Sequence, residues 1–264
     1  MGLLDGKIGL VVGIANERSY AWFIAQSLMQ HGARVAFTHL PGERNEARCR
    51  RAINALGDFP SAKDPFLVPM DAAKDEDIDA AFTKYAEKFD RMDFLIHSIA
   101  FAEREYLQFG KFLSTPRAAY MQAVDISAYT LLGLAARAKP IMAKTGGSIL
   151  GMSYYGAEKV VQGYNVMGVA KAALEATSRY LAAEMGPDKI RVNIISGGYL
   201  RTLASSAVGG TDKLGDAVPE KAPLRRNVEG EDVGKTAVYL CSDLSSGVTG
   251  ETIYVDCGIN IIGA

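Results

Sequence analysis

Cysteine and histidine are scarce in this chain of 264 residues. Its cysteines, Cys49, Cys241 and Cys257, are odd in number and form no CxxC pair. Neither a disulfide framework nor a zinc ribbon is therefore expected, and a reducing cytoplasm is the simplest compartment. The three histidines lie far apart and lack the spacing of helical metal ligands, so no metal site is predicted.

An excess of one charge and a long apolar run are also missing. Lys and Arg number 29 against 30 Asp and Glu, a formal net charge of −1, so the chain offers no overall positive field for nucleic acid or anionic lipid. No apolar run reaches the roughly 18 residues that a membrane span requires. Asp5 and Lys7 stand where a signal peptide would carry its apolar core. We therefore expect neither nucleic-acid binding, membrane insertion nor secretion.

The composition of the chain is that of a single globular domain. At 48% hydrophobic and 22% charged residues, a chain of this length buries about 70–75% of its unfolded surface, so residues 1–264 are expected to form a single domain. Short aliphatic runs recur, and several are apolar throughout, as in strands covered on both faces. The expected strands are Ile8–Val12, Arg34–Thr38, Phe66–Met70, Phe94–His97, Ser148–Met152, Arg191–Ile195 and Thr252–Val255.

Longer segments with helical periodicity separate these runs. Alternation of strand and helix predicts an α/β fold: a doubly wound, Rossmann-like parallel sheet of about seven strands with helices on both faces. The segment 199–219 is longer than most connections, contains three glycines and is predicted to be a substrate-binding lid. The expected helices are Tyr20–His31, Glu43–Leu56, Asp75–Phe89, Ala118–Lys144, Tyr164–Met185 and Gly230–Ser242.

The first strand runs into a turn typical of dinucleotide binding. Gly13 ends the strand, and Ser19 stands where the next helix begins, with free N–H groups that suit a pyrophosphate. The usual GxGxxG is absent, so an ordinary glycine turn capped by Ser19 is the alternative. Ser98 and Ala100 follow the fourth strand, which should flank the same crevice. His97 stands at the end of that strand. We interpret it as a structural residue, with a role as catalytic acid or base as the alternative.

Tyr164 and Lys171 form the candidate chemical pair. Seven residues apart on a regular helix, they return to within about 20° of one face, roughly 10 Å apart along the axis. A lysine there can bind cofactor hydroxyls and bias the phenol toward proton donation. The alternative is two amphipathic side chains extending from a packed helix.

Taken together, these features resemble the short-chain dehydrogenase/reductase superfamily, and within it the NADH-type enoyl-acyl carrier protein reductases of bacterial fatty-acid synthesis. Two divergent motifs carry the resemblance: Gly13-x5-Ser19-x-Ala21 and Tyr154-x9-Tyr164-x6-Lys171. Nearly the whole chain takes part. Further matches are His97-Ser98-Ile99, Asp125-Ile126-Ser127, Arg201-Thr202-Leu203-Ala204, Cys241-Ser242-Asp243-Leu244 and Val255-Asp256.

The resemblance implies hydride transfer from a nicotinamide to the β-carbon of a trans-2-enoyl thioester on acyl carrier protein. It implies that Tyr164 binds the thioester oxygen, that Lys171 binds the nicotinamide ribose, and that Tyr154 lines the substrate pocket; these are the predicted catalytic residues. Around the cofactor it places Gly13, Ser19, Tyr20, Leu40, Asp71, Ala72, Ser98, Ile99, Ala100, Lys171, Leu200 and Thr202. Around the substrate it places Phe101, Tyr154, Tyr164, Met167, Leu203, Ala204 and Val208.

Departures from the family pattern bear on cofactor choice and on the lid. Leu40 ends the second strand without an acidic or basic partner for the ribose, which favours NADH; Arg44 and Arg48 keep NADPH as the alternative. Ala100 replaces a frequent glycine, and Tyr199 replaces a frequent proline next to the predicted lid.

Two rival functions remain at this point. A carbonyl reductase of the superfamily should carry Tyr-x3-Lys, but Gly168 occupies the place of that lysine. A dinucleotide-binding sensor without turnover would keep the fold. The superfamily also implies a homotetramer.

Overall fold

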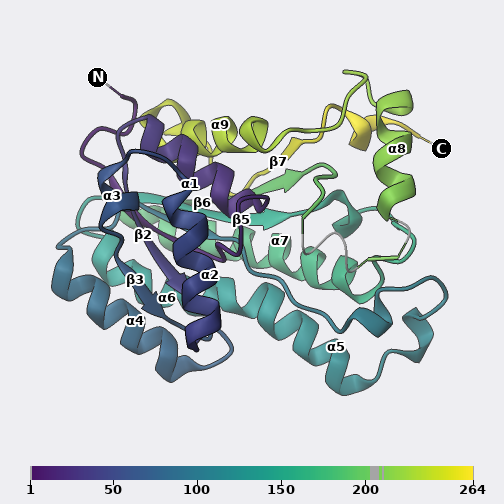
Figure 1. The fold of residues 1–264 in the computed structure, drawn as a ribbon, viewed down its shortest axis with the longest axis horizontal. Coiled ribbons are helices and arrows are strands. Elements are labelled where there is room, and N and C mark those ends of the chain that lie inside the picture. The colour runs from purple at the N-terminus through teal and green to yellow at the C-terminus, as the bar shows by residue number, and fades with distance from the viewer. Residues whose placement is uncertain (1, 203–207, 210, 264) are drawn as a thin grey trace.

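The seven strands in the described part of the chain lie in one parallel sheet. The computed structural model of the chain describes residues 2–202, 208–209 and 211–263. The strand order is β3-β2-β1-β4-β5-β6-β7, so the chain reverses its direction of growth between β1 and β4 (Figure 1). The strands are β1 (Ile8–Val12), β2 (Arg34–His39), β3 (Leu67–Pro69), β4 (Phe94–His97), β5 (Gly147–Ser153), β6 (Ile190–Gly197) and β7 (Thr252–Val255).

Helices cover both faces of the sheet, as the apolar strands predict (Figure 1). One layer holds α1 (Tyr20–Gln30), α2 (Glu43–Asn54) and α9 (Gly230–Cys241), whose buried side chains share one hydrophobic cluster. The opposite layer holds α4 (Asp75–Lys88), α6 (Thr130–Met142) and α7 (Val166–Met185) around a second cluster. The Rossmann-like doubly wound fold predicted from the sequence is confirmed.

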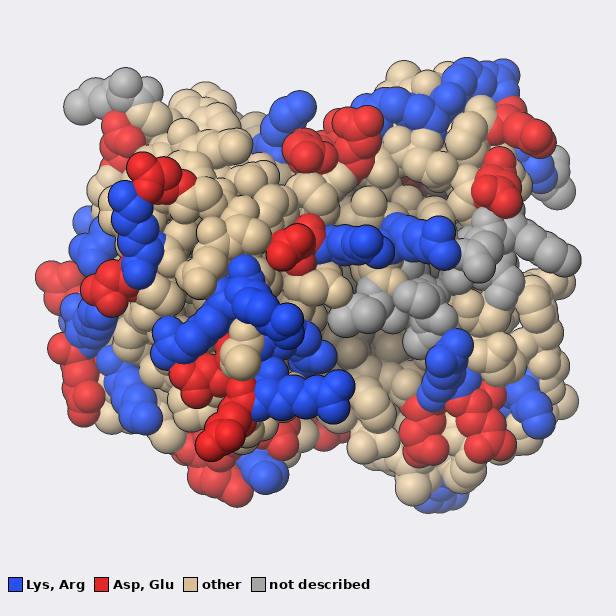
Figure 2. All heavy atoms as spheres, in the orientation of Figure 1, with Lys and Arg blue, Asp and Glu red and all other residues tan. Residues whose placement is uncertain are grey.

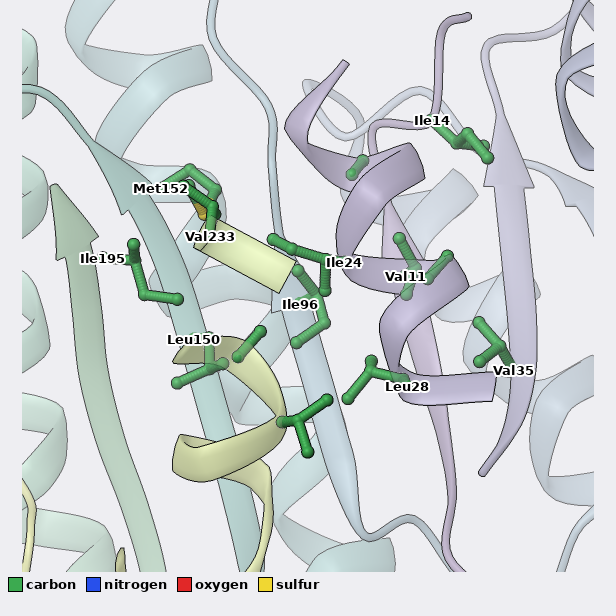
Figure 3. Packing of buried hydrophobic residues seen from close by; sticks show 14 of the residues in the cluster. Val11, Ile14, Ile24, Leu28, Val35, Ile96, Leu150, Met152, Ile195 and Val233 are labelled. Atoms are coloured by element: carbon green, nitrogen blue, oxygen red, sulfur yellow. The ribbon is translucent and has the colours of Figure 1, made fainter. Parts of the chain in front are cut away.

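Close packing of α1 against α9 depends on two glycines. A Cβ at Gly230 would lie 2.1 Å from the Phe23 ring, and one at Gly234 would lie 2.1 Å from Ser27 Oγ. Beneath this helix pair, Ile24 and Leu28 of α1 point toward the aliphatic side chains of the central strands (Figure 3). The layer is therefore dense enough to fix where α1 begins, at the carboxyl end of β1.

One long helix of the sequence prediction is divided in the structure. Ala118–Lys144 becomes α5 (Arg117–Val124), a π-helical turn (Asp125–Tyr129) and α6. Within the wide turn, the Ser127 hydroxyl accepts a hydrogen bond from the Phe101 amide at 3.0 Å and donates to the Phe101 carbonyl at 3.2 Å. A hydrophobic pattern with a period of 3.6 residues does not reveal the extra residue of a π-turn. Such a turn is stabilised by tertiary contacts, here those of Ser127 with Phe101.

Two helices were not predicted at all. These are α3 (Pro60–Lys63) and α8 (Thr211–Lys221), the second inside the predicted lid. Gly215 and Pro219 lower the intrinsic helix propensity of α8. Contacts with residues outside α8 compensate for this low propensity. The Tyr199 ring packs directly against Gly215, and the Asn227 side-chain amide donates a hydrogen bond of 2.9 Å to the Gly215 carbonyl.

Element boundaries otherwise agree closely with the sequence prediction. β1, β4 and β7 have the predicted bounds, and the other strands differ by one or two residues at an end. Short 3-10 turns complete the described chain at Arg104–Tyr106, Phe112–Ser114, Tyr155–Ala157, Gly186–Asp188, Asp243–Ser245 and Ile259–Ile261.

The surface carries mixed charge. On the face shown in Figure 2, basic and acidic side chains are interspersed, in keeping with the net charge of −1. Among the described residues, no helix combines the length and hydropathy needed to cross a membrane.

Candidate active site

The carboxyl ends of β1 and β4 mark the switch point of the sheet, where doubly wound folds bind their ligands; we call this region the crevice. Gly13 leaves β1 with φ of 103°, and a Cβ at this position would lie 2.1 Å from the Ser98 carbonyl oxygen. Only glycine permits this turn and this approach. The structure thus places Gly13 and Ser98, two predicted cofactor residues, side by side.

The start of α1 supplies a ready anion site. Ser19 caps the helix by accepting a hydrogen bond from the Trp22 amide at 3.3 Å, while its hydroxyl donates to the Asn16 carbonyl at 2.8 Å. The Tyr20 hydroxyl donates to the Gly198 carbonyl at 2.8 Å, which ties this turn to the end of β6. A glycine turn followed by a capped helix start fits the pyrophosphate of a dinucleotide.

The remaining predicted cofactor residues follow other strands at the same edge of the sheet. Leu40, after β2, is 53% exposed and offers no hydrogen-bonding side chain. Asp71, after β3, accepts a hydrogen bond from the Ala73 amide at 3.1 Å. Ala72 follows it, Ile99 and Ala100 extend the turn after β4, and Leu200 and Thr202 follow β6.

Two tyrosines face one another beside the crevice. The rings of Tyr154 and Tyr164 are 5.1 Å apart at 73°, an edge-to-face contact. Gly156 makes room for Tyr164, because a Cβ there would lie 2.6 Å from the ring. Burial raises the pKa of both phenols above the ordinary value for tyrosine. Both hydroxyls are therefore protonated donors at neutral pH.

Lys171 lies on the face of α7 that covers β5. Its side chain is buried, and Nζ donates to the Met152 carbonyl at 2.7 Å. Burial lowers the pKa of Lys171 to about 8, while the nearby Glu175 carboxyl opposes this shift. The amine is therefore predominantly charged at neutral pH, and a fixed positive charge stands beside the crevice.

A buried acid accompanies the lysine, and the sequence argument missed it. Glu175 lies one turn beyond Lys171 on α7, and its Oε1 accepts a hydrogen bond from Ser153 Oγ at 2.5 Å. Burial raises the pKa of Glu175, and the Ser153 bond partly offsets the shift. Because Ser153 donates to this carboxyl, it differs from a serine left free for substrate. The i, i+4 spacing of Lys171 and Glu175 was the available signal.

The predicted helix over Tyr164–Met185 starts two residues late. α7 begins at Val166, and Asn165 has φ of 46° and ψ of −121°, a conformation that costs a non-glycine residue about 1–3 kcal/mol. Tyr164 therefore lies in the preceding turn and not on the helix. The argument that Tyr164 and Lys171 share a helical face was wrong in its geometry, although the charge of Glu175 raises the pKa of each.

His97 is fully buried at the end of β4. Its Nε2 lies 2.7 Å from Thr130 Oγ1, and that hydroxyl donates to the Ile126 carbonyl at 2.7 Å. The network thus assigns the proton to Nε2, whereas Nδ1 has no partner among the described residues. Burial, with a contribution from the charge of Lys171, lowers the pKa of His97 to about 3. The imidazole is neutral in the folded protein.

A third hydrophobic cluster joins α5, α7 and the chain beyond β6. The predicted substrate residues Met167 and Val208 are buried in it, and Tyr164 packs against it. Phe101, also predicted, is 44% exposed. Leu203 and Ala204 lie outside the described residues. In the described part of the chain, no group of three or more His, Cys, Asp or Glu side chains could hold a metal ion.

The fold, the Gly13 turn and the capped start of α1 are those of a Rossmann-like dinucleotide-binding protein. A family model described as "Enoyl-(Acyl carrier protein) reductase" matches residues 13–260. The chain is 49% identical to the enoyl-acyl-carrier-protein reductase (NADH) FabI of Synechocystis sp. and 45% identical to that of Bacillus cereus, covering 98% and 100% of each relative. The chain belongs to the enoyl-(acyl carrier protein) reductase family.

Solved structures of similar proteins have the same fold. The crystal structure of the Bacillus cereus enoyl-acyl carrier protein reductase with NADP+ and indole naphthyridinone has a TM-score of 0.94 at 44% identity, and each chain is covered completely. The corresponding NADH reductase from Aquifex aeolicus has a TM-score of 0.93 at 41% identity, again with full coverage of both chains.

Proposed function

We propose that this protein reduces the carbon–carbon double bond of trans-2-enoyl thioesters carried by acyl carrier protein, with NADH as reductant, in the elongation cycle of fatty-acid synthesis. The proposal is supported by the edge-to-face contact of Tyr154 with Tyr164 and by the buried Lys171 on the helix that follows Tyr164, in a member of this family. The oxidoreductase class follows from family membership; the residue roles below are our assignment.

The crevice residues would hold the cofactor. Gly13, Ser19 and Tyr20 would surround the pyrophosphate, where the α1 N-terminus offers unpaired N–H groups. Leu40, Asp71 and Ala72 would lie near the adenosine. The nicotinamide half would lie near Ser98, Ile99, Ala100, Lys171, Leu200 and Thr202. Bound NADH supplies the hydride.

Tyr164 would bind the thioester oxygen of the substrate. Its half-buried phenol stays protonated and can donate to the negative charge that develops on that oxygen when the β-carbon accepts hydride. Lys171 adds a positive charge and would hold the ribose. Tyr154 would fix the orientation of the Tyr164 ring and line the acyl pocket together with Phe101, Met167, Leu203, Ala204 and Val208.

NADH is favoured over NADPH by the residue at the end of β2. A ribose 2′-phosphate needs a cation at that point, and Leu40 presents an exposed apolar side chain. Arg44 and Arg48 on α2 support NADPH as the alternative. The Arg48 guanidinium donates a hydrogen bond of 3.2 Å to Asn45 Oδ1, so one of its N–H groups is already used within α2.

We further propose that residues 1–264 form one domain, with segment 199–219 as the lid, and that the enzyme acts in the cytoplasm as a homotetramer. The acyl carrier protein delivers the substrate. A tetramer predicts a solution mass near 113 kDa, four times 28.3 kDa, by light scattering. A monomer at micromolar concentration would contradict it.

The carbonyl-reductase alternative is disfavoured at one position. Gly168, where that branch would carry its lysine, has no room for a side chain, because a Cβ there would lie 2.7 Å from the Gly156 carbonyl oxygen. The sensor alternative predicts cofactor binding without turnover, so a kinetic assay separates it.

The deciding experiment follows the loss of NADH absorbance with a trans-2-enoyl thioester, in parallel with NADPH and with an acetoacetyl thioester. Oxidation of NADH with the enoyl substrate alone is expected. Tyr164→Phe should lower kcat by about 10²–10³-fold while NADH binding persists. Tyr180→Phe is the matched control, since that tyrosine is 81% exposed on α7. Turnover of the ketone, or full activity of Tyr164→Phe, would contradict the proposal.

A further inference from the structure

The turn that carries Tyr164 has an unusual side-chain partner. Asn165, between Tyr164 and the first residue of α7, holds the left-handed φ of 46° that ends the turn. Its side chain does not cap the helix. Instead, Nδ2 donates two hydrogen bonds of 2.8 Å, one to the Tyr106 carbonyl and one to the Gln108 carbonyl. Both acceptors belong to the segment between β4 and α5.

The same segment also contacts the chain beyond β6. Between the two carbonyls that bind Asn165, the Leu107 carbonyl accepts a hydrogen bond from the Gly209 amide at 2.8 Å. Gly209 approaches the turn from its other end as well, because a Cβ at Gly163 would lie 2.7 Å from the Gly209 carbonyl oxygen. Three segments distant in sequence therefore meet around Tyr164.

Apolar packing follows the hydrogen bonds. Leu107 and Val208, next to the bonded groups, are buried with Met167 in the third hydrophobic cluster, and Tyr164 packs against that cluster. If Asn165 served only to accept the positive φ, its side chain would not need hydrogen bonds to residues 106–108. The amide of Asn165 uses both of its hydrogens on one segment, which fixes the turn relative to the pocket wall.

We propose that Asn165 is a positioning residue for Tyr164: its amide holds the turn outside the helix and couples the placement of the phenol to the docking of Gly209 on residues 106–108. The inference deepens the proposed function and rests on it. Misplacement of a catalytic donor by about 1 Å can cost on the order of a hundredfold in rate. Loss of the amide should therefore affect kcat more than cofactor binding.

Asn165→Gly is the decisive variant, because glycine accepts the positive φ and removes only the amide. We expect kcat for the enoyl thioester to fall by about 10–100-fold, with the Kd for NADH within about twofold of wild type and an unchanged or raised melting temperature. Lys189→Gly is the matched control: Lys189 has a φ of 59° at the opposite edge of the sheet, and its loss should leave kcat unchanged.

Asn165→Asp adds a pH readout that a purely conformational role would not give. Aspartate also tolerates positive φ, but its ionised carboxylate would face two carbonyl oxygens and could donate to neither. Once protonated it can donate one bond. The ratio of kcat for Asn165→Asp to kcat for Asn165→Gly should therefore rise as pH is lowered.

Each outcome has a distinct meaning. Wild-type kcat in Asn165→Gly would overturn the positioning role, as would a parallel loss of kcat, NADH binding and thermal stability. A pH-independent ratio for the Asp and Gly variants would overturn the part assigned to the amide. Absence of enoyl reduction in the wild-type protein would overturn the proposed function, and the inference with it.

Discussion

The helices α1 and α7 both start at the crevice, yet they start in opposite ways. α1 begins after a glycine turn, with Ser19 in an extended conformation and its hydroxyl capping the helix. α7 begins after Asn165, which is strained and gives its side chain to a distant segment. The first start is built from neighbouring residues. The second depends on contacts with residues 106–108 and with Gly209.

This contrast matches the two tasks that we assign to the crevice. A dinucleotide has constant chemistry, so a helix start with free N–H groups suffices, and local sequence specifies it. A catalytic phenol must be held at one point relative to both cofactor and acyl chain. At Asn165, tertiary hydrogen bonds hold a strained backbone conformation, and this fixes the position of the neighbouring Tyr164 at a cost in conformational energy. Variants at Gly13 and Ser19 test the local part of this contrast, and a variant at His97 tests the buried end of β4 beside it.

The largest effect is expected from Gly13→Ala. The new methyl group would lie 2.1 Å from the Ser98 carbonyl oxygen in a backbone conformation with φ of 103°. We expect a loss of about 3–5 kcal/mol in unfolding free energy by urea titration, together with weaker NADH binding. Gly6→Ala is the control, since Gly6 has φ of 75° but nothing within 4 Å; it should cost only about 1–2 kcal/mol. Equal losses would show that the approach of β1 to β4 is unimportant.

An intermediate effect is expected from pH, through His97. Its pKa is about 3 in the folded protein and near 6.5 when unfolded, so the unfolded chain binds the additional proton between these values. The contribution of the neutral imidazole is complete above the unfolded pKa. It is lost as pH falls, by up to about 1.4 kcal/mol per pH unit.

His97→Leu should remove this dependence. Between about pH 6.5 and about pH 5, the unfolding free energy of wild type should fall by about 1.6 kcal/mol more than that of the variant. Urea titrations of both proteins above pH 7, where the imidazole is neutral in both states, provide the baseline. Parallel pH profiles would mean that His97 is reached by water or finds a partner for Nδ1.

The same contrast explains what the sequence could predict. Strand runs, the Gly13 turn and the Ser19 cap are local patterns, and they predicted the fold class and the start of α1. The turn at Asn165, the π-turn at Ser127 and the Ser153–Glu175 bond join residues distant in sequence, and periodicity does not encode them. The spacing of Tyr164 and Lys171 first suggested them as a pair through a helical geometry that was incorrect, and the resemblance supplied the roles predicted for them.

The smallest effect is expected from Ser19→Ala, and it tests the local character of the α1 start most directly. Loss of the cap should cost about 1 kcal/mol of unfolding free energy. It should also weaken NADH binding by severalfold and leave kcat at saturating NADH within about twofold, because the hydrogen bonds of Ser19 run to Asn16, Trp22 and Phe23 in its own turn. Ser19→Thr, which keeps the capping hydroxyl, should restore stability. If Ser19→Ala lowered kcat as much as Asn165→Gly does, the two starts would be coupled through the Tyr20–Gly198 bond, and the division into a local cofactor half and a tertiary catalytic half would not hold.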